Sequence, residues 1–379
     1  MTTIEFPSSV VFSPTDRLKP SLGVGAAFRD PTLRRVYLEF NSNGLGDVVN
    51  LVPLIQEIAA LRPDIAILMV SSQWKIPFRW TAPNVSTLQA PPPKADRNAT
   101  GTLYFDLTPH VRFHLYCPHW LQFFFITGIG TYTGRGDPFP LLDEHEVASF
   151  SSRLSDAVGN ARGYILVHLE NTRQEWEGRN TDPENLLAVA RVLAKNGYRV
   201  LEIGNENPPS GEFAHLGMLT LEELIYAMKF CDGFVGIDSF PMHLAALYDK
   251  PLLGFFAATQ PEVVLPPVTR LTLLRNEAIP CNGCVYITRP RDYNRCTLGH
   301  LECTQRLPES YLMEQLADFE RSIEGGIQHL PMAAEQQHSW RMAQLLFEES
   351  LLLDRARGKR FVPNELRRRI AASISSEIT

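Results

Sequence analysis

One segment, residues 234–261, constrains the fold of this chain more than any other. It reads FVGIDSFPMHLAALYDKPLLGFFAATQP: a short apolar run, a polar turn, a helical pattern and a second short apolar run. Short, uninterrupted apolar runs are typical of strands buried on both faces of a parallel sheet. We therefore expect strand, helix and strand here, with polar residues after both strands. Because ligands bind at the carboxyl ends of strands in such sheets, the polar turns predict a ligand site.

The same alternation of apolar runs and helical patterns occurs earlier in the chain. The expected strands are residues 35–40, 64–71, 102–107, 164–168, 199–203, 234–237 and 251–256. One expected helix, over residues 48–63, follows a glycine-rich turn, one begins at Asp182-Pro183-Glu184, and one follows a capping box that starts at Thr220. Strands that alternate with helices are typical of parallel, doubly wound sheets. The sequence therefore predicts an α/β protein.

The length of the chain predicts more than one domain. At 379 residues it exceeds what one ordinary core holds, because domains average about 150 residues. Turn signals before a polar helical pattern place the boundary near residue 160. The expected parts are an N-terminal extension (1–33), an N-terminal Rossmann-like domain (34–160), a C-terminal Rossmann-like domain (161–330) and a helical segment (331–379).

Charge and hydropathy exclude several classes of partner. The net charge of -6 argues against a nucleic-acid partner. No apolar run reaches transmembrane length, and the N-terminus has no signal-peptide pattern, so we expect the cytoplasm. Residues 355–369 are locally basic, which indicates either a solvated helix face or contact with a peripheral anionic surface.

The glycine-rich turn Gly44-Leu45-Gly46-Asp47 lies between an expected strand and helix. Glycines there let the backbone approach a ligand. Position 49 is Val, so the turn is not the GxGxxG pattern, and we expect no NAD. Asp47 has two interpretations, as a residue that caps the helix or as a general base.

The second candidate cluster follows the expected strand at 234–237. Asp238, Ser239 and His243 either form an ordinary helix cap with a core histidine or bind a phosphorylated sugar. The loop after residue 168 supplies Thr172, Arg173 and Arg179. Arginine suits a diphosphate because its hydrogen bonds are paired and charge-assisted, although an ordinary exposed loop is the alternative.

Four of the six cysteines lie close together in the sequence. Cys281, Cys284, Cys296 and Cys303 are separated by two, eleven and six residues. In a reducing compartment this spacing favours a metal site over disulfides, and four thiolates suit tetrahedral zinc or iron. With no open ligand position, the expected role of the metal is structural. Cys117 and Cys231 stand in apolar contexts and indicate buried thiols.

Together these motifs resemble glycosyltransferase family 9, the ADP-heptose-dependent heptosyltransferases, over roughly residues 34–320. The resemblance implies a GT-B fold, in which two Rossmann-like domains face each other across a cleft and the second binds the donor. GLGDVVNLVPLIQEI resembles the family's N-terminal motif and implies that Asp47 is the base. The segment 234–261 resembles the donor motif, which assigns to the donor site Asp238, Ser239, His243 and Thr259.

The sequence departs from the family pattern in two places. Phe240 stands where the family usually has glycine, and the loop after residue 168 lacks the usual lysine, which Arg173 or Arg179 replaces. By the resemblance, Glu206 lies where a ribose or base contact is expected. The cysteine cluster resembles the cysteine-bearing members, among them autotransporter heptosyltransferases, which carry an iron-binding finger and modify protein.

The resemblance implies an inverting glycosyltransferase that moves a sugar, heptose from ADP-heptose, to an acceptor hydroxyl on a glycan or protein. Two alternatives remain: the same fold with a nucleotide-hexose donor, and a non-catalytic protein that binds nucleotide sugars or serves in assembly. A homo-oligomer is compatible with all of these readings.

Overall fold

The structure is a computed structural model. It describes residues 4–5, 28–42, 44–71, 78–108, 111, 119–127, 131–132, 137–140, 144–170, 177–204, 210–265, 270–279, 282–283, 296 and 301–325. By its internal contacts the chain divides into two compact units. Unit 1 comprises Met1–Phe113 and Pro118–Leu141, and unit 2 comprises His114–Cys117 and Leu142–Thr379.

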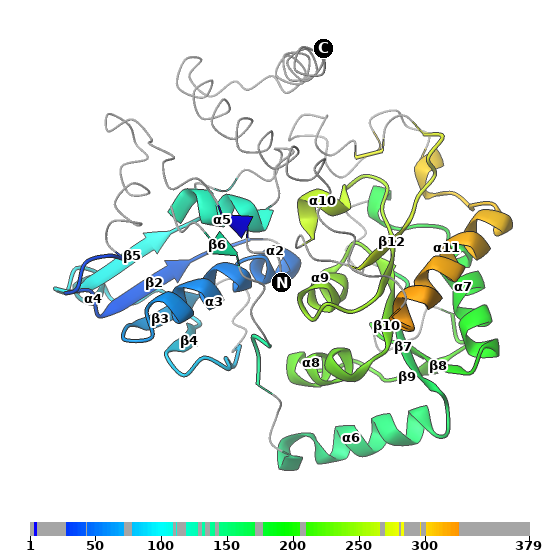
Figure 1. Ribbon diagram of the computed structural model, residues 1–379, viewed down its shortest axis with the longest axis horizontal. Coiled ribbons are helices and arrows are strands. Elements are labelled where there is room, and N and C mark those ends of the chain that lie inside the picture. Colours follow the sequence, from blue (N-terminus) through cyan, green and yellow to red (C-terminus); the bar gives the residue numbers. More distant parts are fainter. Residues whose placement is uncertain are drawn as a thin grey trace. The chain divides into compact units, whose positions relative to one another are not determined.

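Unit 1 contains a four-stranded parallel sheet in the order β4-β3-β2-β5, drawn in blue to cyan in Figure 1. Its strands are β2 (Arg35–Glu39), β3 (Ala66–Val70), β4 (Val85–Leu88) and β5 (Thr102–Asp106). Its helices are α2 (Leu45–Val49), α3 (Val52–Leu61), α4 (Lys94–Arg97) and α5 (His119–Thr127). The short strands β1 (Ile4–Glu5) and β6 (Thr131–Tyr132) pair antiparallel. Of the strands in unit 1, β2, β3 and β5 were expected, whereas β1, β4 and β6 were not.

The helix expected after the glycine-rich turn is in fact two helices. α2 ends at Val49 and α3 begins at Val52, so the prediction of one continuous helix is wrong. Pro53 lies in the first turn of α3, where its missing N–H costs nothing. In the interior of a longer helix the same proline would remove a hydrogen bond and clash with the preceding turn.

Unit 2 contains a six-stranded sheet in which every pairing is parallel, in the order β12-β11-β10-β7-β8-β9 (Figure 1). The strands are β7 (Gly163–His168), β8 (Tyr198–Glu202), β9 (Ala214–His215), β10 (Gly233–Ile237), β11 (Leu252–Phe255) and β12 (Leu271–Leu274). Four of them match the expected strands, while β9 and β12 were not expected. This order is that of a doubly wound Rossmann sheet.

Helices cover both faces of the unit 2 sheet. The α-helices are α6 (Glu144–Val158), α7 (Pro183–Lys195), α8 (Leu221–Phe230), α9 (Phe240–Leu247), α10 (Pro261–Val264) and α11 (Glu309–Ile323). Two 3-10 turns are η1 (Glu177–Arg179) and η4 (Glu302–Thr304). In Figure 1, α7 and α11 lie on one side of the sheet and α8 and α9 on the other.

One buried apolar cluster of unit 2 lies between its sheet and the helices α7 and α11. Leu312, Leu316 and Phe319 recur at helical spacing and are buried in one cluster with α7 and the strands. At Gly233 an added Cβ would lie 2.7 Å from the Phe319 ring. The strand can therefore approach the helix this closely only with glycine at that position.

The starts of two helices confirm the expected capping signals. Asp182 is the N-cap of α7 and accepts a hydrogen bond from the Glu184 amide. Thr220 and Glu223 form the reciprocal capping box that begins α8.

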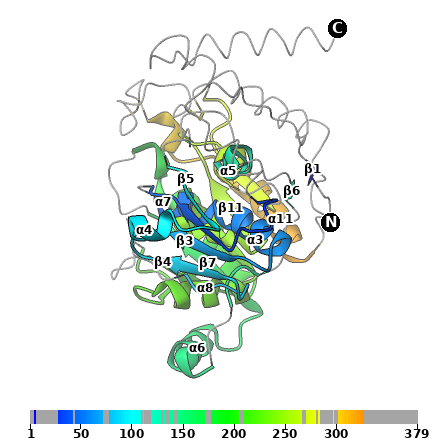
Figure 2. The ribbon, with the colours of Figure 1, turned by 90° about the vertical axis from the view of Figure 1, so that its left-hand side faces the viewer.

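α6 lies ahead of the boundary expected near residue 160, yet it packs against α8 in unit 2. Arg153 forms a 2.8 Å ion pair with Glu223, and the Phe150 ring meets Tyr226 edge-on. The two helices lie side by side in both Figure 1 and Figure 2.

Several expected features lie outside the residues that the structure describes. They are most of the N-terminal extension, the helical segment 331–379 and the basic stretch 355–369 within it. Among the helices that the structure does describe, none is both long and apolar enough to cross a membrane.

Candidate functional site

The order in which the chain adds strands to the unit 2 sheet reverses between β7 and β10, which are hydrogen-bonded neighbours. The chain continues outward to β8 on one side and to β11 on the other. In open α/β sheets this switch point leaves a crevice at the carboxyl ends of the two strands, where ligands bind. His168 ends β7, and Asp238 and Ser239 follow β10, so all three lie at the switch point.

Asp238 is buried at the centre of a polar cluster. The Thr259 hydroxyl donates a 2.7 Å hydrogen bond to its Oδ2. Arg179 Nε lies 3.4 Å from Oδ2, and His243 Nε2 lies 3.4 Å from Oδ1. The four residues come from four places: the end of β10, the loop after β11, η1 and α9. Four of the predicted donor-site residues are thus brought together.

The cluster determines the charge of Asp238. Burial by itself raises the pKa of Asp238, but the Arg179 charge, with His243 and Thr259, outweighs burial and holds this pKa below its usual range. The carboxylate is therefore ionised at neutral pH and paired with Arg179.

Ser239 makes different contacts from those expected of a helix cap. It occupies the N-cap position of α9, but its side chain makes no capping hydrogen bond. Its Oγ donates 3.1 Å to the Ile237 carbonyl and lies 3.0 Å from His168 Nδ1. The hydroxyl therefore joins the ends of β7 and β10 at the switch point.

His168 is a site residue that the sequence reasoning missed. It is buried, and burial lowers its pKa from 6.5 to about 4, so the imidazole is neutral at neutral pH. The sequence signal that could have identified His168 is its position as a polar residue at the carboxyl end of a buried strand.

Arg179 is held in place by the backbone of η1. The Ala258 amide donates 3.2 Å to the Gly178 carbonyl, and a Cβ at Gly178 would lie 2.7 Å from the Ala258 side chain. Glycine therefore allows η1 to approach the loop that carries Thr259. Of the other expected donor residues, Thr172, Arg173 and Glu206 lie outside the described residues.

In unit 1, the glycine-rich turn arranges a second polar cluster around Asp47. The Ser42 hydroxyl donates 2.6 Å to Asp47 Oδ2, and the Gly44 amide donates 3.1 Å to Ser42 Oγ. A Cβ at Gly44 would lie 2.8 Å from Asp47 Oδ2, so a larger residue there would displace the carboxylate from this position. Gly44 is the N-cap of α2, and the interpretation of Asp47 as that cap is wrong. Gly46 is buried within α2.

His119, the first residue of α5, lies on the other side of the Asp47 carboxylate. Its Nδ1 is 3.4 Å from Asp47 Oδ1. The His119 side chain is 6% exposed and the Asp47 side chain 23% exposed. Sequence reasoning gave His119 no role, because 71 residues lie between it and Asp47 and no local pattern joins them.

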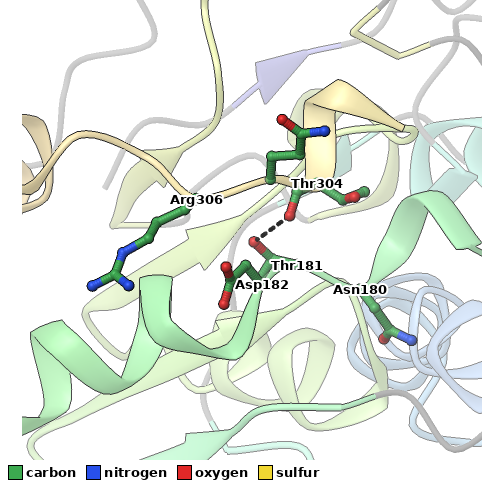
Figure 3. Close-up of a pocket in the computed structure, with 6 residues that line it drawn as sticks. Asn180, Thr181, Asp182, Thr304 and Arg306 are labelled. Atoms are coloured by element: carbon green, nitrogen blue, oxygen red, sulfur yellow. Dashed lines mark hydrogen bonds between the residues drawn. The ribbon is translucent and has the colours of Figure 1, made fainter. Parts of the chain in front are cut away.

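A pocket of about 510 Å³ lies beside η1, where residues 180–182 meet residues 304–306 (Figure 3). Thr181 Oγ1 donates a 3.4 Å hydrogen bond to the Thr304 carbonyl, and Asn180 and Arg306 extend to opposite sides of this contact (Figure 3). The pocket lies between the start of α7 and η4. Its lining residues do not include the Asp238 cluster.

The expected metal finger lies only partly within the described residues. Cys303 is buried in η4 and Cys296 is half-buried, whereas Cys281 and Cys284 lie outside the described residues. Gly283 adopts a left-handed φ of 74°, which suits the tight turn of a C-x-x-C knuckle, and its amide donates 2.6 Å to the Ala257 carbonyl. No group of three or more candidate metal ligands occurs among the residues described, so the four-cysteine site stays a prediction.

Comparisons with known proteins agree with this architecture. Residues 187–292 match the model of glycosyltransferase family 9 (heptosyltransferase). A search of curated proteins finds no match. Among solved structures, the iron-containing dodecameric glycosyltransferase TibC from enterotoxigenic E. coli H10407 shares 18% identity at a TM-score of 0.56, covering 77% of this chain and 81% of that one.

Two further structures are similar. The family 9 glycosyl transferase from Veillonella parvula DSM 2008 shares 13% identity at a TM-score of 0.55, over 76% of this chain and 97% of that one. TibC in complex with ADP-D-beta-D-heptose shares 16% identity at a TM-score of 0.54, over 77% of each chain. At such identities the similarity shows a shared fold.

The family match covers the chain from α7 to beyond β12, and therefore includes the Asp238 cluster apart from Arg179. It agrees with the resemblance expected from the sequence motifs. Residues 187–292 are thus similar to glycosyltransferase family 9 (heptosyltransferase), and the chain shares the fold of TibC and of the Veillonella parvula glycosyl transferase.

Proposed function

We propose that this protein transfers heptose from ADP-heptose to an acceptor hydroxyl, with inversion at the anomeric carbon. The main observation that supports this proposal is the charged cluster around Asp238 at the switch point of the unit 2 sheet. The choice of donor is supported by the ADP-heptose complex of TibC, which shares the fold.

Arg179 supplies the positive charge for the donor diphosphate. Its side chain is 25% exposed, whereas Asp238 is buried. Asp238 therefore orients Arg179 and His243, and Arg179 makes charge-assisted hydrogen bonds to phosphate oxygens. The hydroxyl proton of Thr259 is already donated to Asp238, so Thr259 helps to hold that carboxylate in place.

The start of α9 supplies a further donor to the leaving diphosphate. The Met242 and His243 amides donate to the Ser239 carbonyl, and Pro241 has no amide proton. The Phe240 amide is then the first-turn donor for a phosphate oxygen. Negative charge that develops as the sugar–phosphate bond breaks is stabilised there and by Arg179.

Asp47 is the base in this mechanism. It takes the proton of the acceptor hydroxyl while the acceptor oxygen attacks the anomeric carbon and the bond to the diphosphate breaks. Ser42 orients the carboxylate, which stays accessible. The proposal requires the GT-B arrangement expected from the sequence, with Asp47 and the Asp238 cluster acting on one substrate pair.

Two further features belong to the proposal. A structural metal ion, iron or zinc, is held by Cys281, Cys284, Cys296 and Cys303 and takes no part in the reaction. The left-handed Gly283 in the knuckle and the burial of Cys303 are consistent with such a site. A homo-oligomer is also expected, because the similar protein TibC is dodecameric.

Calorimetry against ADP-heptose, GDP-sugars and UDP-sugars, paired with a transfer assay, tests the donor. We expect ADP-heptose to bind and to support transfer, and Arg179→Gln to weaken its binding about tenfold or more. Arg306→Gln is the matched control, because Arg306 is 66% exposed and lies outside the Asp238 cluster. Preference for a nucleotide hexose would change the donor, and binding without transfer or slow donor hydrolysis would indicate a non-catalytic protein.

A further inference from the structure

The Asp47 carboxylate is held from two sides by side chains that the sequence motif does not contain. Ser42 donates to Oδ2 at 2.6 Å, and His119 Nδ1 lies 3.4 Å from Oδ1. Each oxygen of the carboxylate therefore has its own neighbour. Two separate neighbours restrict rotation of the carboxyl group, which a single hydrogen bond would leave free.

Burial separates the roles of the two titratable groups. The His119 side chain is 6% exposed, whereas that of Asp47 is 23% exposed. Asp47 is therefore the more accessible of the two to an acceptor hydroxyl, and His119 is the more deeply buried. The deeper burial of His119 favours a role that acts through Asp47.

The Nδ1–Oδ1 separation is longer than an ideal hydrogen bond. Hydrogen bonds at catalytic groups are often long before substrate binds and tighten in the productive complex. The contact requires a proton on Nδ1, and the partner of one ring nitrogen sets which nitrogen carries the proton. A tightened contact with the carboxylate would therefore favour the Nδ1–H tautomer of His119.

We propose that His119 is a positioning residue that donates Nδ1–H to Asp47 Oδ1 and, with Ser42, fixes the base for transfer. This inference rests on the proposed role of Asp47 as the base. The proposal gives a role to His119, the first residue of α5, which lies outside the glycine-rich motif.

Two substitutions of His119 separate positioning from packing. In His119→Asn an amide nitrogen takes the place of Nδ1, while His119→Leu fills the space without a donor. We expect His119→Leu to lower kcat about tenfold or more, with the KM for donor and acceptor unchanged within twofold. We expect His119→Asn to keep kcat within a few-fold of the wild type. His215→Leu in β9 is the matched control and should leave kcat unchanged.

A spectroscopic measurement on the wild-type protein needs no turnover. Nitrogen-15 NMR of histidine-labelled protein above pH 8 reports which ring nitrogen is protonated, and the His119 signal is the one lost in His119→Asn. We expect Nδ1–H in the wild type and loss of this preference in Asp47→Ala.

The outcomes distinguish this inference from the proposed function. Wild-type kcat in His119→Leu, equal losses in both His119 variants, or an Nε2–H tautomer would each overturn the positioning role. Absence of sugar transfer by the wild-type protein would instead overturn the proposed function. The tautomer measurement stays decisive for His119 in that event and if His119→Leu does not fold.

Discussion

At the scale of single residues, the two acidic side chains of the candidate site lie in different environments. Asp238 is buried among Arg179, His243 and Thr259, which hold it ionised. Asp47 is partly exposed beside Ser42. A carboxylate surrounded by protein donors orients them, whereas an accessible one can accept a proton from a substrate. The environments thus support the separate roles proposed for the two residues.

Asp47→Asn tests the proposed base. The amide keeps the size of the side chain but cannot accept the acceptor proton, so we expect transfer to fall by about 10²–10⁴-fold. Donor affinity measured by calorimetry should stay within twofold. Asp96→Asn, at an exposed position of α4, is the control. Wild-type turnover in Asp47→Asn would remove Asp47 from the mechanism.

His168 predicts a pH dependence of stability. Because burial lowers its pKa in the folded state from 6.5 to about 4, the unfolded chain binds more protons between these pH values. The free energy of unfolding should therefore fall by roughly 3 kcal/mol as the pH drops from 6.5 to 4, and no further on this account below pH 4.

Urea unfolding at several pH values measures this effect. His168→Gln cannot titrate, so its stability should change less over that range than that of the wild type. His215→Gln controls for loss of a histidine elsewhere in unit 2. Equal pH slopes for the wild type and His168→Gln would contradict the prediction.

At the scale of elements, one buried side chain ties the start of α7 to the segment after η4. Asn185 Nδ2 donates 2.7 Å to Thr181 Oγ1 and 3.0 Å to the Gln305 carbonyl, and the Leu307 amide donates 2.7 Å to Asn185 Oδ1. These bonds fix the chain that follows Cys303, beside the pocket in Figure 3. Asn185 thus positions two loops that carry little regular structure of their own.

Asn185→Ala should lower the free energy of unfolding by about 2–4 kcal/mol, because it leaves buried backbone groups without partners. Urea unfolding measures the loss. Asn196→Ala is the matched control at the other end of α7, where the side chain makes an exposed hydrogen bond to Glu320, and should cost under about 1 kcal/mol. Similar losses in both variants would contradict the proposed tie.

At the scale of the whole molecule, each unit is built on a parallel sheet whose strand order reverses at one point. In unit 2 that point lies between β7 and β10, and in unit 1 it lies between β2 and β5. The Asp238 cluster follows the first of these points, and the loop that leads to Asp47 leaves the end of β2. Each sheet therefore places one polar cluster where open α/β sheets bind ligands.

The cysteine cluster predicts a property of the purified protein. Elemental analysis should find close to one equivalent of zinc or iron per chain, and Cys303→Ser should lose it. Cys231→Ser is the matched control, since burial raises the pKa of Cys231 to about 12 and keeps that thiol protonated. A protein with neither metal would contradict the four-cysteine proposal.

Much of the fold could be predicted because its signals are local. The apolar runs of β2, β7 and β10, and the caps at Asp182 and Thr220, lie within a few consecutive residues. β4, with its half-exposed side chains, and the break before Pro53 were missed. β4 depends on its place beside β3 in the sheet, whereas the break before Pro53 follows from the local cost of proline inside a helix.

The sequence by itself determined the α/β class, the family resemblance and the candidates Asp47, Asp238, Ser239, His243 and Thr259. Only the tertiary structure decided what surrounds them. It brings His168 next to Ser239 and His119 next to Asp47. Among the described residues, it places the Arg179 guanidinium beside Asp238. The physical reason is distance along the chain: these pairs are joined by strand order and helix packing, and no local sequence pattern specifies which residues meet.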